Sequence, residues 1–292
     1  PHPEEWREIV VNVMPKMREV TDWKDVRLLS VCKILPKLYS TCVVLMTETV
    51  LASNGVLRRL GIYGFMSGRK PYEITASLTH LGQHASKWKD EQLHLGICDV
   101  LQAFDHCTVD NFRVGLEYCK IPKYLQHALL QPLMYSKCEI ICEGLEVPGV
   151  SWDKSIRTGG PEGPLAFNCI AAAMWGGIFD RWDSLGMGYE VDFASTERDE
   201  VGGSMHFKES VSHCLWADNV VILSKSRSEL THMIDEMTLS LANFGMRWKP
   251  ASLAYLVFGE NVEYGPDGEI STDQDLVLPQ HGLCFRSCEE LE

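Results

Sequence analysis

The chain has 292 residues, 45% of them hydrophobic, so it can bury the core of one large or two small domains. Its formal net charge of −13 argues against strong binding of a phosphate backbone by this chain alone, although a basic cleft can exist in an acidic protein. No apolar run is expected to span a membrane, and the first residues resemble neither a signal peptide nor a translation start. We expect a piece excised from a longer protein.

The sequence contains 11 cysteines but no Cys-x-x-Cys pair. Cys138/Cys142 and Cys284/Cys288 are each four residues apart and could bind zinc, but neither has a second pair at finger spacing. Cysteines scattered among apolar residues are typical of reduced core positions in an intracellular protein. We therefore expect core cysteines, and metal binding by either pair stays open.

Hydrophobic periodicity predicts helices and strands that alternate along the chain. Helices are predicted over residues 4–17, 38–51, 73–88, 108–119, 123–135, 165–182 and 228–244, with Thr108 and Gly245 as caps. Strands are predicted over 93–100, 138–142 and 253–258, with a hairpin over 211–223. Residues 192–203 are predicted to form a loop. The pattern favours the α+β class, with an antiparallel hairpin at its centre.

Two acidic residues stand at the ends of predicted strands. Asp99 follows an apolar strand, and Asp218 lies at the tip of the predicted hairpin. Joining a 3′-hydroxyl to a nucleotide uses two cations about 4 Å apart, and Mg²⁺ prefers oxygen ligands. Carboxylates on adjacent strands of one sheet would supply them. Taken singly, Asp99 could cap the next helix and Asp218-Asn219 could be an ordinary turn, so the order and surroundings of the motifs decide.

Several short motifs occur in a defined order. Asp-Val-Leu-Gln-Ala-Phe-Asp occupies 99–105, Arg-Thr-Gly-Gly-Pro-Glu-Gly-Pro-Leu-Ala-Phe-Asn occupies 157–168, and Trp-Ala-Asp-Asn-Val occupies 216–220. These runs resemble motifs A, B and C of the reverse transcriptase domain of LINE-type (non-LTR) retrotransposons. Segments 27–39 and 63–69 resemble its fingers motifs, and 245–259 includes its motif D region. The resemblance covers about residues 6 to 259.

The resemblance implies a site for nucleotidyl transfer. Asp99 and Asp218 would bind Mg²⁺ with the carbonyl of Val100 as a further ligand, and Asn219 would belong to the catalytic set. Phe104 stands where an aromatic ring selects deoxynucleotides by crowding a ribose 2′-hydroxyl. The nucleotide-binding residues implied by the resemblance are Arg27, Lys37, Arg69, Arg157 and Gly159. Arg69 and Lys37 are the weaker candidates, and a surface or packing role is at least as strong an alternative for them.

The chain departs from the family pattern at motif positions that matter for catalysis. Asn219 replaces the second Asp of motif C, which keeps an oxygen ligand but removes a negative charge. Thr158 replaces the Gln of motif B. Ser252 stands where motif D has a Lys, although Lys249 is close by in the sequence.

The resemblance implies an α+β right-hand polymerase palm with partial fingers and a thumb that is largely absent. Partial fingers are expected over 1–92, the palm over 93–259, and an acidic irregular tail over 260–292. The expected activity is Mg²⁺-dependent, RNA-templated DNA synthesis, with an RNA template, a DNA primer and dNTPs as partners and no membrane. The resemblance also implies an intracellular part of a longer polyprotein, in the nucleus or cytoplasm, without its flanking domains. The alternatives are a decayed, inactive copy that at most binds nucleic acid, and an RNA-dependent RNA polymerase.

Overall fold

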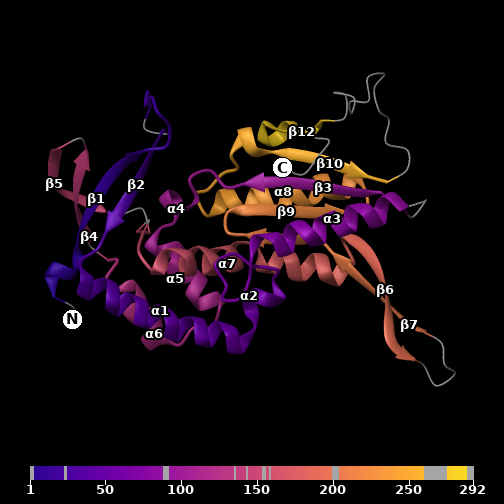
Figure 1. The fold of residues 1–292 in the computed structure, drawn as a ribbon, viewed down its shortest axis with the longest axis horizontal. Helices are drawn as coiled ribbons and strands as arrows, with labels where there is room; N and C mark the ends of the chain where they lie inside the picture. Colours follow the sequence, from indigo (N-terminus) through magenta and orange to yellow (C-terminus); the bar gives the residue numbers. More distant parts are fainter. Residues whose placement is uncertain are drawn as a thin grey trace. The chain divides into compact units, whose positions relative to one another are not determined.

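The computed structural model describes residues 3–22, 25–87, 92–134, 136–142, 144–152, 156–157, 159–198, 204–259 and 275–287 (Figure 1). The chain forms two compact units. Unit 1 comprises Pro1–Arg59 and Gln102–Met174, and unit 2 comprises Leu60–Leu101 and Trp175–Glu292. The division into fingers and palm at residue 92 stays a prediction.

Unit 1 is built on a four-stranded sheet in the order β2-β1-β4-β5. Its strands are β1 (Glu8–Pro15), β2 (Val26–Val31), β4 (Ser136–Cys142) and β5 (Leu145–Trp152). Strand β1 is antiparallel to β2 and parallel to β4. The helices are η1 (Glu4–Arg7), α1 (Ile34–Asn54), α2 (Val56–Arg59), α4 (Ala103–His106), α5 (Val109–Tyr118), α6 (Lys123–Leu130) and the first part of α7 (Glu162–Leu185). Thr108 caps α5 as predicted, because its Oγ1 accepts the Asn111 N–H at 3.0 Å.

The helix predicted over residues 4–17 is wrong. Only η1 is helical there, and β1 follows it directly. Along β1, the side chains of Ile9 and Val11 are buried while their neighbours are more exposed, which is the period of a strand. The segment is rich in β-branched residues, and pairing with β2 and β4 outweighs its partial match to helical spacing.

Unit 2 is built on a six-stranded sheet in the order β11-β12-β10-β3-β9-β8. Its strands are β3 (Leu93–Asp99), β8 (His213–Trp216), β9 (Asn219–Ser224), β10 (Ala254–Phe258), β11 (Leu276–Leu278) and β12 (Leu283–Ser287). The helices are α3 (Pro71–Lys87), α8 (Arg227–Asn243), η3 (Pro250–Ser252), η5 (Pro279–His281) and the second part of α7. Strand β3 is central and antiparallel to both neighbours (Figure 1), and Leu93 and Leu95 are fully buried. The apolar run that predicted this strand is explained by burial on both faces.

Two segments of unit 2 are more regular than the sequence indicates. The loop predicted over 192–203 is wrong for residues 192–198, because β6 (Tyr189–Arg198) and β7 (Ser204–Val211) form an antiparallel ribbon. Residues 199–203 lie outside the described part. In Figure 1 this ribbon extends away from the six-stranded sheet. The tail predicted to be irregular contains β11 and β12. The pairing partners of these strands are not visible in local sequence, and residues 260–274 and 288–292 lie outside the described part.

Helix α1 corrects the expectation that no apolar run reaches the length of a membrane span. It is the one described helix that is long and apolar enough to cross a membrane by length and composition. One such helix is weak evidence for a membrane span, because the buried core helices of soluble proteins pass the same test. In α1, 28% of the apolar window is buried. Large apolar side chains are exposed along it, among them Ile34, Leu35, Leu38, Leu45 and Met46.

The described cysteines are free, and Cys98, Cys107, Cys119, Cys138 and Cys169 are buried, as predicted for reduced core residues. The prediction is wrong for Cys42 and Cys284, which are exposed, while Cys32, Cys142 and Cys214 are partly buried. In the described ranges, no group of three or more His, Cys, Asp or Glu side chains could hold a metal. Cys288 lies outside those ranges, so the pair Cys284/Cys288 stays a prediction.

Candidate active site

The pairing of β3 with β9 brings the two predicted acids together in unit 2. Asp99 ends β3, and its partner in the antiparallel register is Asn219, the first residue of β9. Trp216 of β8 pairs with Asn219, so Ala217 and Asp218 form the turn of the hairpin. The N–H of Val100 donates to the carbonyl of Asp218 at 3.1 Å, which joins the end of β3 to this turn.

The pairing of Asp99 with Asn219 and the hydrogen bond from Val100 to Asp218 place the Asp99 and Asp218 carboxyls close together. Burial raises the pKa of Asp218, and the neighbouring Asp99 raises it further. Two neighbouring carboxylates repel each other when both are charged, so the pair favours a shared proton or a bound cation. A raised pKa together with a close charge partner is common at functional sites.

Lys249 is a site residue that the sequence did not place beside the acids. Its Nζ lies 3.1 Å from Asp99 Oδ2, and its backbone N–H donates to the Asp99 carbonyl at 2.8 Å. Ser252, at the motif D position, instead donates its N–H to the Lys249 carbonyl at 3.0 Å. Lys249 therefore supplies a positive charge next to Asp99, and it also lowers the pKa of Asp218.

The donor set fits Mg²⁺. It offers the carboxylates of Asp99 and Asp218, and the amide of Asn219 is exposed at the start of β9. Magnesium is commonly held by one or two carboxylates, with water and substrate phosphates completing six oxygen ligands. The main chain of Val100 lies beside the turn, but this residue is only 2% exposed, and its role as a ligand stays a prediction.

Arg157 belongs to unit 1 and is 1% exposed. Its guanidinium donates to the Pro132 carbonyl and, at 3.2 Å, to Ser136 Oγ. These contacts tie the loop before α7 to the segment before β4. Because its described partners are protein groups, the structure gives Arg157 a packing role, and nucleotide binding by this side chain stays a prediction.

Gly159 lies two residues after Arg157 in the loop before α7. Thr158, between them, lies outside the described residues. Gly159 has φ +103, and a Cβ there would lie 2.8 Å from the Ser30 carbonyl oxygen. Both facts require glycine.

The other predicted residues of unit 1 vary in exposure. Phe104 is half-buried, with its ring centroid 5.8 Å from that of Phe167. Arg27 on β2 and Lys37 on α1 are exposed. Contact of these residues with a nucleotide is untested.

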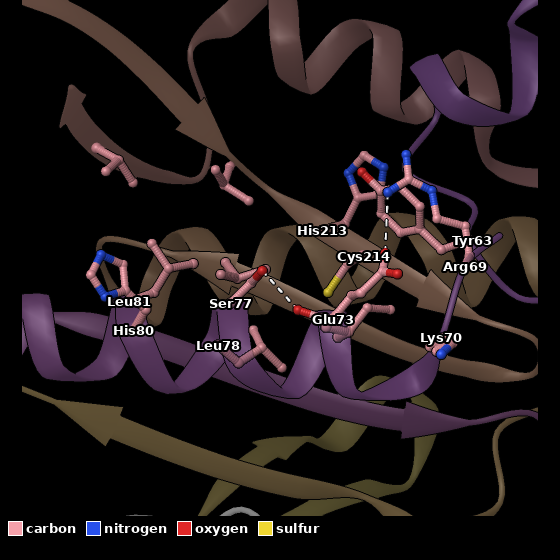
Figure 2. A pocket seen from close by; sticks show the side chains of 14 residues that line it. Tyr63, Arg69, Lys70, Glu73, Ser77, Leu78, His80, Leu81, His213 and Cys214 are labelled. Atoms are coloured by element: carbon pink, nitrogen blue, oxygen red, sulfur yellow. Dashed lines mark hydrogen bonds and ion pairs between the residues drawn. The ribbon is translucent and has the colours of Figure 1, made fainter. Parts of the chain in front are cut away.

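Arg69 lies in unit 2 beside a cavity of about 350 Å³ (Figure 2). Its guanidinium stands 5.2 Å from the Tyr63 ring centroid and forms an ion pair with Glu73 Oε2 at 3.1 Å. Figure 2 shows Glu73 on α3 joined by dashed lines to Arg69 and to Ser77. Arg69 therefore connects the Tyr63 segment to α3, and nucleotide binding by this side chain stays a prediction.

His213, at the start of β8, also lines this cavity. Its Nε2 lies 3.0 Å from the Leu60 carbonyl, its Nδ1 lies 2.8 Å from Ser212 Oγ, and its ring stacks on Phe179. Burial lowers the pKa of His213 to about 4, and burial likewise lowers the pKa of His94, on β3, to about 4. Both imidazoles are therefore neutral in the folded protein near pH 7.

These histidines predict loss of stability in acid. In the unfolded chain each would bind a proton near pH 6.5, whereas the folded protein resists protonation down to about pH 4. Their stabilising effect is complete above the unfolded pKa and lost as pH falls through this window. We expect a slope of up to roughly 1.4 kcal/mol per pH unit for each histidine.

The measurement is the free energy of urea unfolding at about pH 7.5 and about pH 5. In His213→Gln, the difference between the two values should fall by about half if both histidines contribute equally. The exposed His127→Gln is the control and should keep the wild-type difference. A His213→Gln difference equal to that of the wild type would contradict the assignment.

No protein-family model and no curated protein matches the chain. Among solved structures, it is similar to apo telomerase from Candida tropicalis truncated from the C-terminal domain. The TM-score is 0.59 and the identity 9%, over 89% of this chain and 52% of that one. The chain has a reverse transcriptase-like fold.

This likeness confirms the expected mixed α+β, polymerase-like fold. At 9% identity it shows the fold alone, and the chain spans about half the length of the telomerase chain. The finer assignment to LINE-type elements, the activity and the partners are therefore proposals.

Proposed function

We propose that the protein catalyses RNA-templated DNA synthesis by Mg²⁺-dependent nucleotidyl transfer, as an intracellular part of a LINE-type retrotransposon polyprotein. The observation that carries the proposal is the meeting of Asp99 and Asp218 at adjacent strand ends in a reverse transcriptase-like fold. The motif order from residue 99 to residue 220 supports the same activity. The substrates would be dNTPs with an RNA template and a DNA primer.

Asp99 and Asp218 would hold the cations, with the Asn219 amide as a neutral oxygen donor. Bound Mg²⁺ would activate the primer 3′-hydroxyl and stabilise charge on the triphosphate. Before cations bind, the ion pair with Lys249 offsets the negative charge of Asp99. The Lys249 ammonium, which lies beside Asp99, would be placed to donate a proton to the leaving pyrophosphate.

The second candidate is a decayed copy that at most binds nucleic acid. Asn219 favours it, because one negative charge is missing from the cation site. The net charge of −13 also favours it, because it opposes binding of a phosphate backbone. An RNA-dependent RNA polymerase is the third candidate and differs in the sugar that it accepts.

Primer extension on an RNA template separates these candidates. A reverse transcriptase incorporates dNTPs with Mg²⁺ and shows little extension with NTPs. An RNA polymerase gives the opposite preference. A decayed copy extends with neither, while a gel-shift assay still reports nucleic-acid binding. Loss of extension in Asp99→Asn would confirm that the activity comes from this site and not from a contaminant.

Phe104→Ala is expected to increase ribonucleotide incorporation. The side chain is only half-buried, and its ring lies against Phe167 and the start of α7, where a Cβ on Gly163 would contact it at 3.6 Å. Removing a ring that crowds the 2′-hydroxyl lowers the discrimination between sugars. The measurement is the ratio of kcat/KM for dNTP and NTP. Phe167→Leu is the control for altered packing, and an unchanged ratio in Phe104→Ala would reassign Phe104 to packing.

Asn219→Asp is expected to lower the Mg²⁺ concentration for half-maximal extension. The side chain is exposed and stands opposite Asp99, so the new carboxylate would face the same cations. One added charge strengthens the attraction for each divalent cation by roughly 2 kcal/mol at about 4 Å in the water-like dielectric of this exposed position. Asn219→Ser is the matched control and should not lower the requirement. If Asn219→Asp leaves the Mg²⁺ titration unchanged, Asn219 does not face the cations.

A further inference from the structure

The segment Leu60–Gly64 runs along the outer edge of the six-stranded sheet in unit 2. Strand β8 is the last strand of that sheet, and Ile62 forms a parallel bridge with Leu215 of β8. The Leu215 N–H donates to the Gly61 carbonyl, and the Tyr63 N–H donates to the Leu215 carbonyl, both at 3.0 Å. The segment therefore pairs with the strand that leads into the Asp218 turn.

Gly64, at the end of this segment, lies directly against the turn. A Cβ on Gly64 would stand 2.1 Å from the backbone nitrogen of Ala217 and 3.0 Å from the carbonyl carbon of Trp216. These are backbone atoms, so no side-chain rotation can relieve the overlap. The φ of Gly64 is not in the left-handed region, so the need for glycine comes from the close approach alone.

The turn that meets Gly64 has little freedom to move. Ala217 has φ 55, a left-handed conformation that non-glycine residues rarely adopt. The next residue, Asp218, is held through its carbonyl by the N–H of Val100. A shift of the Ala217 nitrogen is therefore transmitted to Asp218, whose carboxyl must stay beside Asp99.

The other side of the segment is also anchored. His213 Nε2 contacts the Leu60 carbonyl at 3.0 Å. Tyr63 lies under the guanidinium of Arg69, which is paired with Glu73 on α3 (Figure 2). The segment is held between α3 and β8, so it cannot move aside freely when the turn is pushed.

We propose that Gly64 is a positioning residue, which fixes the Ala217–Asp218 turn so that the Asp218 carboxylate can share cations with Asp99. The inference rests on the proposed function and adds a residue to it that touches neither cation nor substrate. The Leu60–Gly64 segment is the support, and Gly64 is the point where it contacts the turn.

The test compares Gly64→Ala with Gly177→Ala and Asp218→Asn in the full chain, with Mn²⁺ as the probe. Gly177 lies on α7 with open space around its Cβ position, so it controls for the added methyl group. Mn²⁺ binding is measured by electron paramagnetic resonance, and folding by thermal unfolding. We expect about tenfold or greater weakening of Mn²⁺ binding in Gly64→Ala, as for residues that orient metal ligands, and wild-type binding in Gly177→Ala.

Primer extension gives a second readout. Gly64→Ala should lower kcat and raise the Mn²⁺ requirement, while the KM for dNTP stays near the wild-type value. General damage to the fold would lower the fraction of active protein without changing the Mn²⁺ requirement, so that pattern would contradict a positioning role.

The outcomes separate the two proposals. If Asp218→Asn loses Mn²⁺ binding but Gly64→Ala keeps it, the positioning role is wrong and the proposed function stands. If Asp218→Asn binds Mn²⁺ as the wild type does, the proposed function fails and this inference fails with it. Should Gly64→Ala not fold, the double variant Gly64→Ala/Ala217→Gly decides, because glycine at 217 lets the turn rotate. If the double variant folds and binds Mn²⁺ more weakly than the wild type, the inference is supported. If the double variant does not fold, the inference is contradicted.

Discussion

Asp218→Asn is expected to reduce primer extension by at least about a thousandfold, or roughly 4 kcal/mol in the activation free energy. The substitution keeps the shape of the side chain and removes its charge. Asp218 and Asp99 lie at adjacent strand ends, so both would bind the same cations. Because burial and Asp99 already raise the pKa of Asp218, the folded protein should tolerate the neutral amide, and thermal unfolding should change little.

The measurements are single-nucleotide extension under saturating dNTP and the Mg²⁺ titration of the same reaction. Asp183→Asn is the control, because this exposed carboxylate lies on α7. It should extend primers at the wild-type rate. Extension by Asp218→Asn at a rate within about threefold of the wild type, less than 1 kcal/mol, would exclude Asp218 from catalysis.

Gly115→Ala is expected to destabilise the protein by about 3 kcal/mol or more, at the upper end of the cost of overpacking a core. Gly115 lies on α5 where it crosses the first part of α7. A Cβ there would stand 2.6 Å from the carbonyl carbon of Cys169 and 2.8 Å from the nitrogen of Ile170. Since both are backbone atoms, the two helices must separate to admit one methyl group.

The free energy of unfolding in urea measures this effect. Gly177→Ala is the matched control, because it adds the same methyl group to a helix where the Cβ position is open. Alanine is the better helix former by about 0.5–1 kcal/mol, so this variant should be slightly more stable than the wild type. The two alanine variants are thus expected to change stability in opposite directions. A similar stability for both would show that α5 and α7 are not in close contact at Gly115.

The sequence predicts best where one local signal dominates. The apolar run ending at Asp99 predicted β3, and the two apolar runs joined at Asp218 predicted a hairpin. Antiparallel pairing of these elements then brings the acids together with Asn219 opposite Asp99. The amphipathic pattern and Thr108 likewise predicted α5 and its cap.

The sequence predicts poorly where a partner distant in the sequence decides the structure. Residues 8–15 match a helix by spacing but form a strand because β2 and β4 pair with them. The ion pair of Lys249 with Asp99 joins residues 150 positions apart, and no local pattern reports it. The contact of Gly64 with Ala217 is similar, because the space available to a glycine is set by the fold and not by its neighbours in the chain.

The ion pair between Lys249 and Asp99 has a consequence for how the protein responds to chelators. Many small metal-binding domains unfold when the metal is removed, because metal binding supplies the free energy of folding. Here a tethered ammonium already offsets one of the two carboxylates. A protein stripped of divalent cations by EDTA should therefore keep its fold and recover activity as soon as Mg²⁺ is restored, so that folding and cation loading can be studied as separate equilibria.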